Sequence, residues 1–123
     1  MANEFKTHRV VKATYDFDTL GGGVANAVGL NTFVPNGALI TRVFTVANTA
    51  FTSGGNATVA INVGSVEVNA ATAFDDAAYV AGDQHYGATG ALGVLAADSE
   101  INIDIAVAAL TAGAYDVFVE YLY

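Results

Sequence analysis

The sequence predicts an all-β protein: a single-domain antiparallel β-sandwich of jelly-roll-like topology with at most one short helix. Three observations lead to this prediction. Apolar and β-branched residues come in about six to eight short segments, Gly-rich turns separate these segments, and only one Ala-rich stretch has helical character. The chain of 123 residues can build one hydrophobic core and is too short for two. We therefore expect residues 1–123 to form one domain.

The first half of the chain alternates strand and turn signals. Residues 9–17 predict a strand, and residues 18–23, with three consecutive Gly, predict the loop that ends it. Residues 28–34 predict a short second strand. Pro35, followed by Asn-Gly, predicts a turn, because Pro presets its φ angle and Asn-Gly tolerates positive φ. The clearest interior strand then follows at residues 38–47, which carry apolar side chains on both faces.

The middle of the chain contains the one candidate helix. Residues 52–56 predict a turn, and residues 57–63 alternate apolar with small or polar side chains, as a half-buried strand does. Residues 66–68 predict a short continuation of that strand pattern. Residues 69–81 are Ala-rich, contain neither Gly nor Pro, and predict either a helix or a loop with one helical turn. Residues 82–93 are glycine-spaced and predict irregular structure.

The last two predicted strands have the strongest apolar patterning. Residues 101–107 alternate, and their predicted inward side chains are Ile101, Ile103, Ile105 and Val107. Residues 114–123 form an aromatic and β-branched strand that is apolar on both faces. One face carries Tyr115, Val117, Val119 and Tyr121, and the other carries Phe118 and Leu122. Such a strand is either central in its sheet or covers a partner subunit. Because large rigid aromatic side chains dominate interfaces, we expect subunit packing from Tyr115, Phe118, Tyr121 and Tyr123.

The charges are distributed unevenly along the chain. The net charge is −8, but Lys6, Arg9 and Lys12 against Glu4 give residues 1–12 a net charge of +2, which leaves −10 for the remainder. Four Lys and Arg in all are too few for a nucleic-acid interface. A basic N-terminal arm on an acidic body is suited to docking on an acidic neighbour. The alternative interpretation is a first strand with ordinary solvated charges.

Composition also limits the chemistry that the chain can perform. It has no Cys, which rules out a disulfide framework, a thiolate zinc site and a Cys nucleophile. The N-terminus lacks the apolar segment of a signal peptide, and the longest strictly apolar run, residues 105–110, is too short to span a bilayer. We therefore expect a soluble protein made in a cytoplasm, without membrane partners and without a cofactor.

Three sets of polar residues are candidates for chemistry, and each has a simpler structural interpretation. Asp75-Asp76, or Asp98 and Glu100 with Asp104 nearby, could hold Ca²⁺, but the alternating pattern of a Ca²⁺ loop is absent and solvated or capping carboxylates are the favoured interpretation. A triad can be drawn from Asp83, His85 and Ser99. No nucleophile elbow surrounds Ser99, so the sequence predicts that the protein is not an enzyme.

Three runs of sequence carry recognisable motifs. Residues 35–44 hold a turn-led Gly-Ala-x-Ile-Thr-x-Val strand, residues 49–58 hold a Thr-Ser-Gly-Gly turn, and residues 109–121 hold a final Leu-Thr-Ala-Gly-x-Tyr-x-Val strand. In this order the three runs resemble small structural proteins of tailed bacteriophages, notably cyanophages and other marine phages. In this chain Leu39 and Arg42 occupy the two variable positions of the first motif. The motifs are structural, contain no catalytic residues, and cover the chain from about Val28 onward.

The resemblance implies a virion component, specifically a capsid cement (decoration) protein with a jelly-roll-like fold. Such proteins typically form trimers on the capsid surface, which here implies binding to the outer face of the major capsid protein. On charge alone, Lys6, Arg9 and Lys12 are the expected docking residues. A tail or head-fibre component of the virion is the structural alternative. A carbohydrate-binding adhesion module is the alternative from another class, although the absence of Trp disfavours it.

Overall fold

The computed structural model describes residues 7–75, 84–86 and 94–123, and for residues 84–86 it describes the backbone alone. The described residues form eight strands and one short helix. In chain order they are β1 (His8–Asp16), α1 (Phe17–Leu20), β2 (Ala25–Val34), β3 (Leu39–Ser53), β4 (Thr58–Val63), β5 (Val66–Ala73), β6 (Gln84–Tyr86), β7 (Ser99–Ala106) and β8 (Leu110–Leu122).

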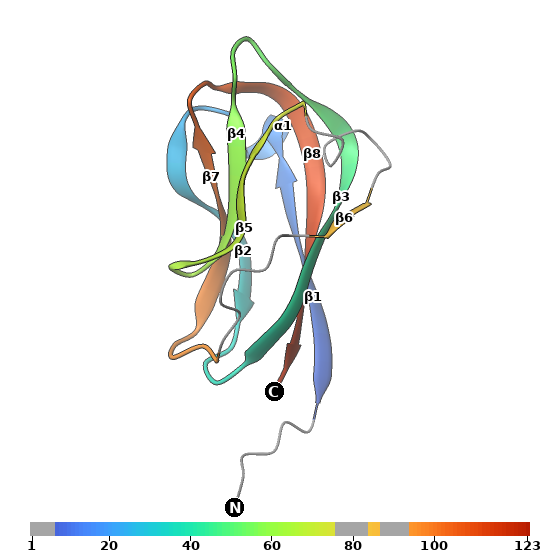
Figure 1. Cartoon of the computed structure of the whole chain (residues 1–123), viewed down its shortest axis with the longest axis vertical. Helices are drawn as coiled ribbons and strands as arrows, with labels where there is room; N and C mark the ends of the chain where they lie inside the picture. The colour runs from blue at the N-terminus through green and yellow to red at the C-terminus, as the bar shows by residue number, and fades with distance from the viewer. Residues whose placement is uncertain (1–6, 76–83, 87–93) are drawn as a thin grey trace, which may run out of the picture.

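The strands form two four-stranded antiparallel sheets that lie face to face (Figure 1). The strand order is β1-β8-β3-β6 in the first sheet and β2-β7-β4-β5 in the second. The first strand pairs with the last, the second with the seventh, the third with the sixth and the fourth with the fifth. One long hairpin rolled into two layers has this connectivity, which defines a jelly roll. The predicted fold class is confirmed.

The terminal strand β8 lies between β1 and β3, in the middle of the first sheet. Its inward side chains are fully or nearly fully buried, namely Tyr115, Val117, Val119 and Tyr121. The outward side chains of Phe118 and Leu122 are half-covered because strands flank β8 on both sides. Of the two interpretations of its doubly apolar pattern, the central strand is correct. Pairing with β3 also extends the strand back to Leu110, four residues before the predicted start.

Three aromatic rings pack edge-to-face in the core at one end of the first sheet. The ring centroids of Tyr15 and Phe51 are 5.8 Å apart, those of Phe51 and Tyr115 are 5.0 Å apart, and those of Tyr15 and Tyr115 are 6.0 Å apart. The Tyr15 hydroxyl donates a hydrogen bond of 2.7 Å to the Gly21 carbonyl. Burial, reinforced by the charge of Asp16, raises the pKa of Tyr15 to about 12. This cluster anchors β1 to β3 and β8 from within.

The predicted helix over residues 69–81 is wrong for residues 69–73, which belong to β5. Asn69 pairs with Ile61, and Ala73 pairs with Thr58 of β4. Alanine has the highest intrinsic helix propensity, but the preference is worth less than about 1 kcal/mol per residue, so pairing with a neighbouring strand outweighs it. Residues 76–81 lie outside the described part of the chain. The described helix is α1, in the segment predicted as a loop, and the Asp16 side chain caps it by accepting a 3.0 Å hydrogen bond from the Asp18 amide.

The inward placement predicted for Val107 is also wrong, since its side chain is 74% exposed. Ile101, Ile103 and Ile105 are buried as predicted, but β7 ends at Ala106. Val107 has a φ of +72°, and the Ala108 amide donates to the Ala106 carbonyl at 2.9 Å across it. This is a tight γ-turn, which is rare and costly for a β-branched residue. The turn reverses the chain into β8 and directs Val107 away from the core.

Candidate functional site

A candidate binding surface in the described part of the chain is the outward side of β1, β8 and β3, which we call the outer face. Alternate residues of these strands line it: His8, Val10, Lys12, Thr14, Arg42, Phe44, Val46, Asn48, Asp116, Phe118, Glu120 and Leu122. Side chains at alternating positions on neighbouring strands lie close enough to pair across a sheet. The outer face therefore carries ion pairs, stacked rings and polar contacts on one surface.

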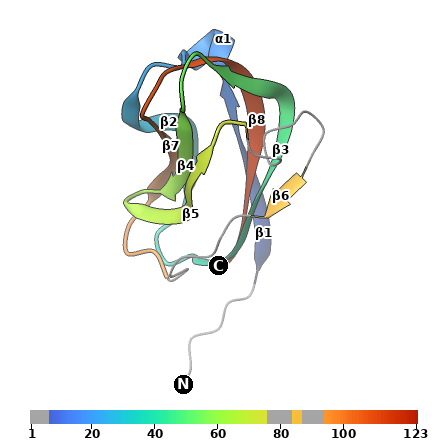
Figure 2. The same ribbon diagram turned by 45° about the horizontal axis from the view of Figure 1, so that its top comes forward.

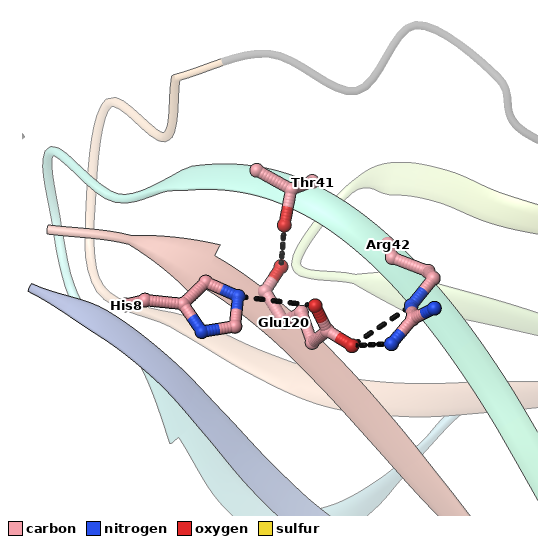
Figure 3. Close-up of polar contacts among 4 residues, drawn as sticks. All are labelled: His8, Thr41, Arg42 and Glu120. Carbon is pink, nitrogen blue, oxygen red and sulfur yellow. Dashed lines mark hydrogen bonds and ion pairs between the residues drawn. The ribbon is translucent and has the colours of Figure 1, made fainter.

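Glu120 is the centre of the polar group on the outer face (Figure 3). Its Oε1 lies 3.1 Å from Nε2 of His8 on β1, and its Oε2 accepts a 2.8 Å hydrogen bond from Nε of Arg42 on β3. A second Arg42 nitrogen, Nη2, also donates to Oε2. The Thr41 hydroxyl donates to the Glu120 carbonyl at 3.2 Å. One carboxylate thus ties together three neighbouring strands of the first sheet.

Two opposing effects act on the pKa of the Glu120 carboxyl. Partial burial raises it, but the hydrogen bonds and positive charges of Arg42 and His8 outweigh burial, so the net pKa lies below the ordinary value of 4.5. A carboxyl with a depressed pKa in the folded state stabilises the fold above its unfolded pKa. That stabilisation disappears as the pH falls from about 4.5 through the depressed value.

Replacing this carboxylate should therefore weaken the fold and reduce its sensitivity to acid. We expect Glu120→Gln to lower the free energy of unfolding by about 1 kcal/mol at pH 7, since both of its charged partners are half-exposed. The loss should shrink below pH 4.5. Urea titrations between pH 3 and pH 7 measure both effects, with Glu67→Gln as the control because Glu67 is exposed and forms no ion pair with a described residue. Parallel pH curves for wild type and Glu120→Gln would contradict the assignment.

An aromatic pair lies beside this polar group. The rings of Phe44 and Phe118 stack with centroids 4.8 Å apart and an interplanar angle of 10°. The guanidinium carbon of Arg42 lies 5.2 Å from the centroid of Phe44, which is a cation–π distance. The register places Lys12 of β1 opposite Phe118. Sequence reasoning found Phe118 and Lys12, but it missed Phe44, which the doubly apolar pattern of the third strand could have indicated.

The structure places the four aromatic residues predicted for subunit packing in two different environments, the core and the surface. Tyr115 is 0% exposed and Tyr121 is 4% exposed, and both lie in the core of their own protomer. They point inward because the second sheet covers that side of β8. Phe118 is half-buried on the outer face, and Tyr123 is 50% exposed at the end of the chain. Of these four predicted residues, Phe118 and Tyr123 are the two that expose aromatic surface.

Two of the three residues predicted for docking lie in the first half of β1. Arg9 and Lys12 are exposed, and neither forms an ion pair with any other described residue. Lys6 lies outside the described residues. Arg42, the remaining cation of the chain, is engaged by Glu120. Positive charge without a described partner is therefore concentrated on β1, whereas Arg42 stabilises the sheet.

The carboxylates around β7 hold the irregular strand β2. Glu100 accepts the Asn31 amide at 3.0 Å, and Asp104 accepts the Ala27 amide at 2.7 Å. Asn31 and Ala27 both have positive φ, at points where β2 departs from regular register with β7. Asp98 accepts the amide of the turn residue Asn36 at 2.8 Å. These contacts account for the acidic pattern that suggested Ca²⁺, and no group of three metal-ligating side chains occurs within residues 7–75 and 94–123.

The imagined triad gains no support from the residues that can be placed. The Ser99 hydroxyl donates to the Ala97 carbonyl at 2.9 Å, which is a local contact within its own turn. Asp83 and the side chain of His85 lie outside the described residues, as does Asp76 of the other candidate pair. None of the helices that the described segments contain has the length and apolar character needed to cross a membrane.

The end of the sandwich opposite the C-terminus carries exposed apolar side chains that the sequence analysis missed. Leu20 and Val24 flank the three Gly residues that follow α1. Val107 is the central residue of the turn before β8. Figure 2 brings α1 and the β7–β8 connection together at this end. The Leu110 amide donates to the Gly22 carbonyl at 2.7 Å, which holds the two connections side by side. For Leu20 and Val24, the three consecutive Gly residues between them were the available signal.

No protein-family model and no curated protein matches this chain. Solved structures match it over nearly its whole length. A chain of the cyanophage Pam1 capsid asymmetric unit matches with a TM-score of 0.64 and 22% identity, covering 99% of this chain and 91% of that one. A chain of the acid-stable capsid of Helicobacter pylori bacteriophage KHP30 matches with a TM-score of 0.62 and 13% identity, covering 98% of this chain and 90% of that one. A chain of the Ralstonia phage GP4 capsid matches with a TM-score of 0.61 and 14% identity, covering 99% of this chain and 88% of that one. This chain therefore shares its fold with similarly sized chains from three phage capsids.

Proposed function

We propose that this chain is a structural virion protein, specifically a capsid cement (decoration) protein that binds the outer surface of the major capsid protein and stabilises a phage head. The observation that carries the proposal is the whole-length match of its jelly roll to chains of three phage capsids. Each matched chain is about as long as this one, so the likeness concerns entire chains and not a shared module. In this proposal the protein is synthesised in the host cytoplasm and is then located on the capsid surface of the virion.

The chemistry of the described surface supports a binding role. Polar side chains on both sheets hydrogen-bond to one another or to backbone, as Glu120 and Asp104 do, and stabilise strands. We assign Arg9 and Lys12, with Lys6, to docking on the shell. We assign Phe118 and Tyr123 to contacts between subunits of a homotrimer. Linking three copies of a modest contact raises the overall affinity of each trimer for the shell.

The copy number of the chain in purified particles tests this proposal. Quantitative mass spectrometry against the major capsid protein should give a ratio near one to one if the chain covers the shell. A handful of copies per particle would place it in a tail or a head fibre. Absence from particles that contain the major capsid protein would overturn the virion role.

A further inference from the structure

The four edge strands of the sandwich differ in how well they could pair with another strand. On the first sheet, β6 has only three residues. On the second sheet, β2 shifts register at two places against β7, and β5 shifts register at two places against β4. In contrast, β1 runs for nine residues in unbroken register with β8. Short or irregular edges resist the addition of another strand, so β1 is the edge best suited to accept one.

The hydrogen-bond pattern identifies which backbone groups of β1 point away from β8. Thr7 and Tyr123 exchange two backbone hydrogen bonds, of 3.2 and 2.9 Å. In an antiparallel pair, bonded and non-bonded positions alternate. The residues whose amide and carbonyl groups face the free edge are therefore His8, Val10, Lys12, Thr14 and Asp16. Among the described strands, β1 pairs with β8 alone.

Only the first half of this edge is open. The second half, at Thr14 and Asp16, faces Gly29 and Leu30 of β2 across a hollow of about 310 Å³. In the first half, His8, Arg9, Val10 and Lys12 are exposed, and Val10 is 49% exposed. Figure 1 shows this half extending toward the end of the sandwich where the C-terminus lies. Residues 8–12 therefore present edge amides, an apolar side chain and two cations together.

We propose that residues 8–12 bind an extended acidic strand of the shell protein by β-strand addition. Backbone hydrogen bonds to His8, Val10 and Lys12 would supply affinity, and side chains would supply selectivity. Arg9 and Lys12 form no ion pair with a described residue, so carboxylates of the added strand would complement them, and an apolar side chain would cover Val10. The inference takes the shell protein as partner from the proposed function, whereas the edge itself stands on the geometry of β1.

Arg9 and Lys12 lie on opposite faces of β1. A synthetic ten-residue acidic peptide that carries Glu on both faces of its extended chain, with Val between them, therefore tests the edge without the shell. NMR hydrogen exchange should show the His8, Val10 and Lys12 amides slowed by about tenfold at saturating peptide, with the Gly54 amide as an unaffected reference. A peptide of the same composition with Pro at its centre should not protect them. No protection by the acidic peptide without Pro overturns strand addition. Protection that appears without peptide and grows with protein concentration assigns the edge to a second copy and also overturns it.

A proline variant then tests the same edge on particles. Val10→Pro removes an amide that points away from β8, and edge strands tolerate Pro at such positions. We expect this variant to keep its fold by circular dichroism but to bind particles stripped of the chain about tenfold more weakly, whereas Val10→Thr binds normally. Normal binding by a folded Val10→Pro overturns the inference and leaves the proposed function intact. If wild type itself fails to bind although the peptide protects the edge, the proposed function fails and the edge remains a strand-binding site.

Discussion

Gly113→Ala should lower the free energy of unfolding by about 3 kcal/mol, the largest loss that we expect from adding a single methyl group. A Cβ at Gly113 would lie 2.2 Å from Cδ1 of Phe51, and the backbone there has a φ of +140°, which L side chains rarely adopt. The Phe51 ring cannot move away freely because it packs between Tyr15 and Tyr115. Both strain and overpacking therefore act on the same aromatic cluster.

Thermal unfolding of purified protein measures this effect. Gly113→Ala should reduce Tm by about 10 °C. The matched control is Gly54→Ala in the β3–β4 turn, where an added Cβ has no heavy atom within 4 Å and φ is not positive. That variant should stay within about 2 °C of wild type. Equal shifts for the two variants would show that the aromatic cluster yields to a methyl group and is not the rigid anchor described above.

The double variant Arg9→Gln and Lys12→Gln should reduce occupancy of capsids by about tenfold while leaving the fold and the oligomer unchanged. Both side chains are exposed, and neither is paired with another described residue, so their loss costs little within the protomer. On a shell they would lie opposite carboxylates, and the proposed homotrimer would lose both contacts three times over. Sedimentation of stripped particles with added protein measures the occupancy.

A control of equal net charge separates docking from general repulsion. Each neutralisation removes one positive charge, so the double variant has a net charge of −10 in place of −8. Ser65→Glu with Ala70→Glu reaches the same −10 at exposed positions of the β4–β5 turn and of β5. The control should bind as wild type does. Full occupancy by the Arg9 and Lys12 variant, or an equal loss in the control, would remove these residues from the docking surface.

Local features of the fold follow from the residues themselves. Alternation in β4 and β7 correctly predicts that Ile61 and Ile103 are buried. The turn after Pro35 forms as predicted: the Ala38 amide donates to the Pro35 carbonyl at 3.2 Å, and Gly37 has a φ of +87°. Alternation and turn chemistry depend on neighbours within a few residues, so a single sequence contains them. The all-β class and the sandwich can be inferred at this level.

Non-local contacts decided the rest. The placement of Tyr115 inside and Phe118 outside depends on which side of β8 the second sheet covers, and no local pattern distinguishes two apolar faces. Residues 69–73 form a strand because β4 offers an edge to pair with, and Ala accepts either conformation. His8, Arg42 and Glu120 meet only because β8 inserts between β1 and β3, which joins the two ends of the chain. Composition and local period therefore determine the layers, whereas strand order, a property of long-range pairing, determines the outer face and the open edge of β1.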